Sequence, residues 1–346
     1  MKKLKIAVFF GGCSSEYGVS LQSADAVMRN LDSQKYELIP VGITKDGDWF
    51  YFTGDLDRIL ADTWQNENDC IPAAISPNKS DRCLLCFCQD GVQKMPIDVA
   101  FPILHGKNGE DGTVQGVIEL AGIPLAGCGT LASALCMDKY RAHQLASVAG
   151  VRVPKACVLK TGMDFHKAQQ FADQIGYPLF VKPVKSGSSY GISKVSESHN
   201  LYNAVVLAFQ YDSEVIIEEQ IDGFEVGCAV LGNDELMFGE VDEIELSGGF
   251  FDFTEKYTLK TSAIHVPARI HPKQAEQVKQ TAGMIYQALG CRGFARVDLF
   301  LTADGQIVFN EVNTIPGFTE HSRYPGMMKA AGYSFGKILD QIIELA

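Results

Sequence analysis

Alternating apolar and polar segments divide the first third of the chain into strands and helices. Residues 14–31 and 112–122 have apolar side chains at helical spacing, and residues 45–52 are typical of a hairpin. The expected strands are residues 5–10, 36–44, 97–104 and 123–127. Because strands and helices alternate, this part predicts a parallel sheet that binds ligands at the carboxyl ends of its strands.

The remaining two thirds mix the same patterns in a different order, and a new unit begins near Met137. Helices are expected at residues 138–150, 164–176, 201–211, 271–290 and 334–346. Strands are expected at residues 151–159, 177–184, 193–196, 214–221, 225–232 and 235–246, followed by a hairpin over 294–313. Successive strands without intervening helices indicate α+β units rather than a second parallel sheet.

The hairpin near the end of the sequence carries the first candidate chemistry. A two-residue turn at 304–305 places Asp298 opposite Glu311 and Arg296 opposite Asn313, all on one face. Facing carboxylates repel each other, so this pair favours a bound cation. Oxygen ligands from two carboxylates and an amide suit Mg²⁺ or Mn²⁺. The alternative interpretation is an ordinary surface hairpin with polar ends.

A strand–loop–strand segment at residues 180–195 provides the second candidate site. Lys182 ends an apolar strand, and the loop that follows contains Gly187, Ser188, Ser189 and Gly191. Glycines and small hydroxyls let backbone N–H groups approach phosphate oxygens, with the lysine as a point charge. The segment is neither a P-loop nor a dinucleotide fingerprint, and a flexible hairpin tip is the alternative.

Composition and charge narrow the classes of function. The 346 residues are enough for two or three domains. A net charge of −12 argues against a nucleic-acid partner or an anionic membrane surface. Residues 1–13 superficially resemble a lipoprotein signal, but their short apolar run fits a first buried strand better. The ten cysteines include Cys83, Cys86 and Cys88, which lack the partners of a zinc site, so buried thiols and a cytoplasmic location are expected.

Ordered motifs along the whole chain resemble one enzyme family. The two candidate sites together resemble the ATP-grasp fold, and four further motifs narrow the resemblance to D-alanine–D-alanine ligases and their vancomycin-resistance relatives. The four motifs are FFGGCSSEYGVS, LHGKNGEDGTVQG, MDK and EVNTIPGFTEHS. The resemblance implies an α/β and α+β protein with an N-terminal Rossmann-like domain at 1–137 and ATP-grasp subdomains at 138–219 and 220–346.

The resemblance also implies cofactors and the residues that bind them. ATP and two Mg²⁺ or Mn²⁺ ions are expected, with the metals on Asp298, Glu311 and Asn313. The ATP contacts would come from Lys139, Lys182, Ser188, Glu218, Glu219, Ile221, Glu225 and Lys256. Among these, the lysines and Ser188 would hold phosphates, 218–221 would line the adenine, and Glu225 would bind the ribose.

The first amino acid and the reacting carbonyl would be held by other matched residues. Glu16 would bind the ammonium and His105 would lie near the carboxylate, while Arg296 and the N–H of Gly317 would form an oxyanion hole. Three more residues complete the expected set: Ser188 and Tyr257, which would lock a lid over the site together with Glu16, and Ser322, which would bind the second carboxylate. The alternatives are a helix-start carboxylate for Glu16 and a loop histidine for His105.

Two further features of the sequence bear on the identity of the second substrate. Arg323 stands where the housekeeping enzymes usually have leucine, and the lid carries Glu-Lys-Tyr at 255–257. Both features resemble D-alanine–D-serine ligases of the VanC, VanE and VanG types, with Asp242 and Phe251 shaping the pocket. The alternatives are a solvent-facing Arg323 in a D-alanine–D-alanine ligase, and a non-catalytic ATP-grasp module. The family also suggests a homodimer.

Overall fold

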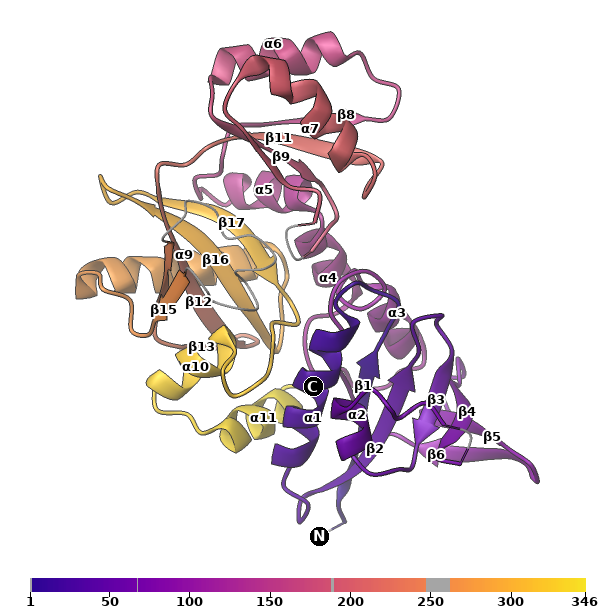
Figure 1. Ribbon diagram of the computed structural model, residues 1–346. Helices are drawn as coiled ribbons and strands as arrows, with labels where there is room; N and C mark the ends of the chain where they lie inside the picture. The colour runs from indigo at the N-terminus through magenta and orange to yellow at the C-terminus, as the bar shows by residue number, and fades with distance from the viewer. Residues whose placement is uncertain (1, 67, 188–189, 247–261) are drawn as a thin grey trace.

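The protein contains three β-sheets, one in each third of the chain (Figure 1). The computed structural model describes residues 2–66, 68–187, 190–246 and 262–346. In the first sheet the strand order is β6-β5-β4-β3-β2-β1-β7. The strands are β1 (Leu4–Gly11), β2 (Tyr36–Ile43), β3 (Trp49–Phe52), β4 (Cys70–Ile75), β5 (Cys83–Cys88), β6 (Gly91–Pro96) and β7 (Val99–Pro102).

The first sheet is mixed, which corrects the expectation of a wholly parallel sheet. Only β2, β1 and β7 run parallel, whereas β2 through β6 pair antiparallel in succession. The physical reason is clearest for β5 and β6, whose two-residue connection is too short for a parallel crossover. The strand expected at 123–127 forms only an isolated bridge between Leu125 and Ala100. The helices of this unit are α1 (Tyr17–Asn30), α2 (Asp57–Leu60), α3 (Thr113–Leu120) and α4 (Thr130–Met137).

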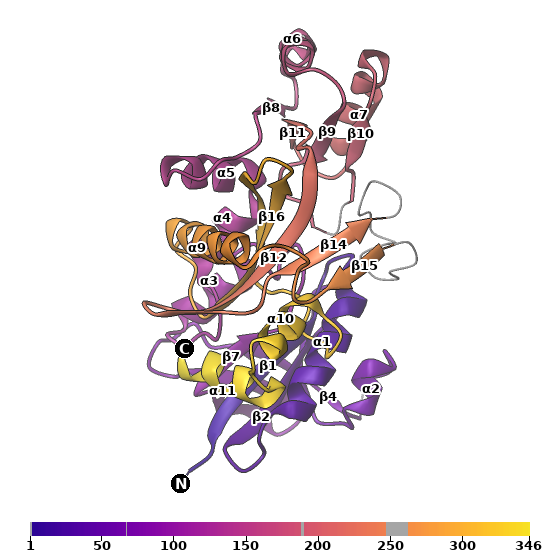
Figure 2. The same cartoon turned by 90° about the vertical axis from the view of Figure 1, so that its left-hand side faces the viewer.

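The second sheet is four-stranded and antiparallel, in the order β10-β9-β11-β8. Its strands are β8 (Ala156–Lys160), β9 (Leu179–Pro183), β10 (Ser193–Val195) and β11 (Glu214–Glu219). The associated helices are α5 (Lys139–Val148), α6 (Phe165–Ile175) and α7 (Leu201–Ala208). Helix α6 begins where the Asp164 side chain accepts the His166 N–H, and ends at Gly176 with a positive φ of 84°. Helices α6 and α7 cover the outer face of this sheet (Figures 1 and 2).

The third sheet carries the hairpin, in the order β15-β14-β12-β16-β17 with β13 on β12. Its strands are β12 (Gly223–Gly232), β13 (Leu236–Phe238), β14 (Asp242–Leu246), β15 (Ser262–His265), β16 (Phe294–Thr302) and β17 (Ile307–Asn313). The helices are α9 (Pro272–Ala288), α10 (Arg323–Ala330) and α11 (Phe335–Glu344). Helix α9 begins with a capping box between His271 and Gln274.

The β16–β17 hairpin has the expected pairing at the site but a different turn. Asp298 faces Glu311 and Arg296 faces Asn313. The turn is one residue longer than predicted, because Thr302 N–H bonds Gln306 O at 3.0 Å and leaves three residues between them. Asp298 pairs with Glu311, but Leu299 pairs with Phe309, so a bulge between these two pairs leaves Asn310 without a partner on β16. The extra turn residue and the extra bulge residue cancel, so the site register is the predicted one.

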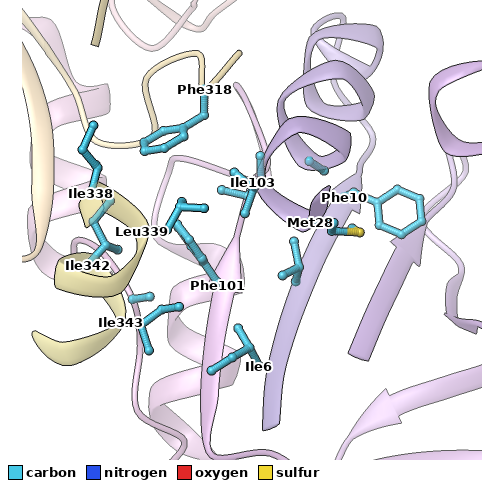
Figure 3. Packing of buried hydrophobic residues seen from close by; sticks show 14 of the residues in the cluster. Ile6, Phe10, Met28, Phe101, Ile103, Phe318, Ile338, Leu339, Ile342 and Ile343 are labelled. Atoms are coloured by element: carbon cyan, nitrogen blue, oxygen red, sulfur yellow. The ribbon is translucent and has the colours of Figure 1, made fainter. Parts of the chain in front are cut away.

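A shared apolar core joins the N-terminal sheet to the third unit. Ile6 and Phe101 from the first sheet pack with Phe318, and with Leu339 and Ile342 from α11 (Figure 3). All five side chains are at most 1% exposed. Buried apolar contacts therefore fix the N-terminal unit to the unit that carries the β16–β17 hairpin. The domain boundaries after residues 137 and 219 fall between the three sheets and stay a prediction.

Cysteines and helix lengths bear on two smaller expectations. Cys83 and Cys86 are buried in β5 and Cys88 is half-buried, and all ten cysteines are free thiols. Cys13 is exposed, so the expectation of buried thiols does not extend to it. Within the described residues, none of the helices combines the length and apolarity needed to cross a membrane.

Candidate active site

A cavity of about 380 Å³ lies where the N-terminal loops meet the end of the β16–β17 hairpin. Seven of the expected residues line it: Glu16, His105, Arg296, Glu311, Asn313, Gly317 and Ser322. Arg323 lines it as well, and so do Glu110 and Gly187. Residues that lie up to 307 positions apart in the sequence therefore share one pocket, between Glu16 and Arg323.

Asp298 is the centre of the polar hairpin tip. Its carboxylate is 1% exposed and accepts hydrogen bonds from Arg296 Nε at 2.8 Å, Arg296 Nη2 at 2.7 Å and Asn313 Nδ2 at 2.9 Å. Arg296 has a raised pKa: burial opposes its charge, but Asp298 favours it more. The arginine therefore stays cationic beside the cavity, where it can stabilise negative charge.

The oxygen donors at this tip fit a hard divalent cation. Asp298 and Glu311 face each other across the hairpin, and Asn313 is next to both. A half-turn of the Asn313 amide would exchange its nitrogen for its oxygen and add a third ligand. No cluster of three or more His, Cys, Asp or Glu side chains that could hold a metal occurs in the described part of the chain. Two carboxylates and an amide would suit Mg²⁺ or Mn²⁺ with phosphate oxygens completing the shell, and the metal site on these three residues stays a prediction.

Arg323 is buried among carboxylates, so the solvent-facing orientation given above as an alternative is wrong. Asp242 accepts from Nε at 2.7 Å and from Nη2 at 2.8 Å, and Glu225 accepts from Nη1 at 2.9 Å. Asp298 Oδ1 is 3.4 Å from Nη1. Burial opposes the charge, but Asp242 and Asp298 hold the pKa of Arg323 well above its ordinary value. The guanidinium is thus a fixed cation in the cavity wall.

Gly227 provides the space for this buried ion pair. A Cβ at position 227 would lie 2.4 Å from Arg323 Nη2 and 2.5 Å from Asp242 Oδ1. Both distances are far below van der Waals contact, so a side chain here would displace the pair. The bidentate geometry at Arg323 therefore depends on a glycine in the neighbouring strand β12.

The expected ATP lysines lie on the other side of the hairpin tip. Lys139 Nζ donates to Ser186 O at 2.7 Å and is 3.6 Å from Glu311 Oε2. Lys182 Nζ lies 2.7 Å from Glu218 Oε2. Burial alone would raise the pKa of Glu218, but Lys182 lowers it below the ordinary value, so the carboxylate is ionised. Lys139 is therefore close to the β16–β17 hairpin. Lys182 is close to the end of β11, where the chain crosses from the second sheet to the third.

The remaining predicted nucleotide contacts lie on or beside this crossing connection. Glu219 Oε1 accepts the Lys155 N–H at 3.0 Å, and Ile221 is half-buried in the turn between β11 and β12. Glu225 follows on β12, where Arg323 binds its carboxylate. The structure thus brings Glu225 to Arg323, which is expected to bind the second substrate. The contact of Glu225 with the ribose stays a prediction.

Glu16 and His105 come together at the N-terminal side of the cavity. Glu16 is the N-cap residue of α1 but makes no side-chain capping bond. Its Oε2 would lie 2.7 Å from a Cβ on Gly187, so the carboxylate contacts the predicted phosphate loop. His105 is 5% exposed and its pKa is lowered by burial. Four predicted residues lie outside the described residues: Ser188, Phe251, Lys256 and Tyr257.

Sequence reasoning missed three side chains that the fold brings to the site. His143 lies behind Lys182, with Nδ1 3.4 Å from Glu218 Oε1. Glu110 lines the cavity and Ser23 lies beneath it on α1. Glu110 is inside the quoted LHGKNGEDGTVQG motif, so its position in that motif was the available signal. Ser23 and His143 resemble ordinary helix residues, and the sequence offered no signal for either.

An N-terminal α/β unit followed by two α+β units is the architecture of the ATP-grasp enzymes. Residues 5–128 match the model of the D-ala D-ala ligase N-terminus, and residues 145–344 match that of the C-terminus. The chain belongs to the D-alanine–D-alanine ligase family, whose cofactors are ATP and a divalent metal.

Similar proteins within the family differ in the substrates that their names state. The chain is 55% identical to the VanG D-Ala:D-Ser ligase of Enterococcus faecalis, with a TM-score of 0.93 and 99% of each chain covered. It is 45% identical to the vancomycin B-type resistance protein VanB of Enterococcus faecalis, covering 100% of this chain and 99% of that protein. It is 43% identical to a D-alanine–D-alanine ligase of Caldicellulosiruptor bescii, covering 100% and 96%. The comparisons therefore establish the family and the vancomycin-resistance relatives, and leave the second substrate open.

Proposed function

We propose that this protein joins D-alanine to D-serine, using ATP, and so supplies a modified peptidoglycan precursor with lowered affinity for vancomycin. The observation that carries the proposal is the buried Arg323, which Asp242 and Glu225 hold in the wall of the substrate cavity. A fixed guanidinium at this place offers donors to a second substrate that carries a hydroxyl.

In the first step the γ-phosphoryl group of ATP moves to the carboxylate of D-alanine, and ADP leaves. Glu16 would hold the ammonium of this D-alanine, while Lys139 and Lys182 would hold the phosphates. Asp298, Glu311 and Asn313 would hold the divalent ions, which when bound neutralise charge on the phosphates. The product of this step is an acyl phosphate, a far better acyl donor than a carboxylate.

In the second step the amine of the second amino acid attacks the acyl phosphate carbon, the C–N bond forms, and inorganic phosphate leaves. The attacking amine loses a proton as the tetrahedral oxyanion forms. Arg296 and the Gly317 N–H would stabilise that oxyanion, and Ser322 would bind the second carboxylate. Water must be excluded in the meantime, which is the role proposed for the segment 247–260, outside the described residues.

The preference for D-serine follows from the donors that Arg323 has left. A guanidinium carries five N–H donors, and three of them donate to Asp242 and Glu225 in the described residues. Of the other two, one on Nη1 faces Asp298 Oδ1 at 3.4 Å, which leaves the second N–H of Nη2 for a serine hydroxyl. A hydrogen bond to a charged group contributes about 1.5–3 kcal/mol, which corresponds to a selectivity over alanine of about 10- to 150-fold.

Two alternatives stay open. A D-alanine–D-alanine ligase would share every ATP and metal residue, and would leave Arg323 as a structural ion pair. A non-catalytic ATP-grasp module is disfavoured, because Arg296, Asp298 and Glu311 are all present and adjacent. A homodimer and a cytoplasmic location stay predictions.

The deciding experiment is product identification by mass spectrometry. The purified protein is incubated with ATP, Mg²⁺ and equal amounts of D-alanine and D-serine. A dominant mixed D-Ala-D-Ser dipeptide is the expected result. A dominant D-Ala-D-Ala product would favour the housekeeping activity, and ATP binding without any dipeptide would favour the non-catalytic module.

A further inference from the structure

The loop 315–319 carries the proposed oxyanion donor, and its backbone is held from two sides. The N–H of Ile315 donates to Glu110 Oε1 at 3.2 Å, and the N–H of Phe318 donates to Ser23 Oγ at 3.1 Å. Thr319 N–H donates to Ser322 Oγ at 3.0 Å, and Pro316 has no N–H. The Gly317 N–H is therefore the one donor of this loop without an acceptor among the described residues, and Gly317 lines the cavity.

His105 connects the two sides into a single network. His105 Nδ1 lies 2.9 Å from the carbonyl oxygen of Ile315, and Nε2 lies 3.2 Å from Ser23 Oγ. A carbonyl oxygen only accepts, so Nδ1 carries the proton. In the neutral imidazole Nε2 carries no proton, so the Ser23 hydroxyl then donates to Nε2 while it accepts the Phe318 N–H. The lowered pKa of His105, which results from its burial, agrees with this protonation state.

Glu110 completes the network from the loop that carries His105. Its Oε2 accepts the Gly106 N–H at 2.8 Å while its Oε1 accepts the Ile315 N–H. The 105–110 loop thus binds both the N–H and the C=O of Ile315. Ile315 lies two positions before Gly317. Both N–H groups that face Glu110 therefore have an acceptor.

We propose that Glu110 and Ser23 are positioning residues for the oxyanion hole, which fix the Gly317 N–H toward the cavity through Ile315 and Phe318. The proposal rests on the ligase function proposed above, because it requires a tetrahedral oxyanion at Gly317. It also changes the role of His105, whose ring nitrogens are both engaged within the protein. His105 therefore acts on the loop 315–318 and not directly on a substrate carboxylate.

Positioning of this donor affects the two chemical steps unequally. The oxyanion forms in the second step, when the amine attacks the acyl phosphate. A displaced Gly317 N–H slows this attack. The acyl phosphate is then lost to water by attack at phosphorus, which breaks the P–O bond, releases the carboxylate and phosphate, and forms no oxyanion at the carbonyl carbon. Each such event releases ADP and phosphate without a dipeptide, so the ratio of phosphate released to dipeptide formed rises above one. A general loss of folded enzyme lowers both amounts together and leaves the ratio unchanged.

The test compares Glu110→Gln and Ser23→Ala with a matched control in the same loop. An amide has one acceptor oxygen, so Glu110→Gln leaves one of the two N–H groups unpaired. Ser23→Ala removes a hydroxyl with little change in volume and gives an independent second variant. Asp111→Asn is the control, because Asp111 also accepts two backbone N–H groups, those of Asn108 and Thr113, but none from the loop 315–319.

The readouts are phosphate and dipeptide measured in the same reaction. Removal of an oxyanion donor costs about 10²–10³ in kcat, so a displaced donor should lower dipeptide formation by about 10- to 100-fold. We expect phosphate release to fall less and the ratio to rise in Glu110→Gln and Ser23→Ala, while Asp111→Asn and the unchanged protein stay near one.

The outcomes separate this inference from the proposed function. If the unchanged protein forms no dipeptide with either amino acid, the proposed ligase function is wrong and the positioning role is wrong with it. If the unchanged protein forms dipeptide and both folded variants keep a ratio near one, the positioning role is overturned while the ligase function stands.

Discussion

Substitution of Arg323 by leucine removes the only cation that contacts Asp242 in the described residues. Asp242 is 0% exposed and receives two of the three hydrogen bonds that Arg323 makes. Loss of one partner from a buried pair costs about 3–5 kcal/mol, because the other charge stays buried.

We therefore expect Arg323→Leu to lower the free energy of unfolding by about 3–5 kcal/mol at pH 7. At about 2–4 °C per kcal/mol for domains of about 150–250 residues, the melting temperature should fall by about 6–20 °C. Urea unfolding measures the first quantity and thermal unfolding the second.

The control for this experiment is Arg269→Leu. Arg269 makes a similar contact to Glu243, with Nη2 2.6 Å from Oε1, but the side chain of Arg269 is 50% exposed, while that of Glu243 is 9% exposed. Water can replace a half-exposed guanidinium, so this variant should lose clearly less stability than Arg323→Leu. Asp242→Asn introduced into Arg323→Leu should recover part of the lost stability. An Arg323→Leu protein as stable as the original would refute the reasoning.

Three further predictions concern the same cavity. Gly227→Ala should displace the Arg323 guanidinium and lower the ratio of D-Ala-D-Ser to D-Ala-D-Ala product; an unchanged ratio in the competition assay would show that the pair does not set selectivity. Glu311→Gln should weaken Mn²⁺ binding in the presence of ATP by about tenfold or more, measured by electron paramagnetic resonance; equal affinity would remove Glu311 from the metal site. Burial, together with the charge of Glu16, raises the pKa of Glu110 to about 8, against the opposing effects of the Gly106 and Ile315 N–H groups and of Arg296. Protonated Glu110 therefore favours the folded state, and the unfolding free energy should fall as pH rises from about 4.5 to about 8, by at most about 5 kcal/mol. Urea titrations of Glu110→Gln should lack this component, and identical pH profiles would contradict the assignment.

Local sequence patterns were sufficient to predict most of the helices and strands, and also the pairing of residues in the β16–β17 hairpin. Asp298 and Glu311 could be paired from the sequence because side chains alternate along strands and because the Asp-Gly pair marks the turn. The turn length itself was wrong, and the pairing survived only because the bulge at Asn310 compensates. Bulges leave no distinct sequence signal, so this compensation could not be predicted.

The contacts that the sequence could not predict all connect distant segments. Glu110 and Ile315 are 205 positions apart, and Arg323 and Asp242 are 81 apart. Residue type suggested that Arg323 would face a hydroxyl, but its three carboxylate partners come from strands β12, β14 and β16. Which polar groups meet in a cavity depends on how the three sheets pack, and a single sequence carries no periodicity that encodes this packing.

The apolar core that joins the first sheet to α11 has a consequence for biogenesis. Ile6 and Phe101 are synthesised long before Leu339 and Ile342, which pack against them. During that interval the nascent N-terminal unit exposes part of a surface that is buried in the native protein, a condition that favours aggregation and chaperone binding. The N-terminal unit is thus expected to reach its native state only after α11 has been translated.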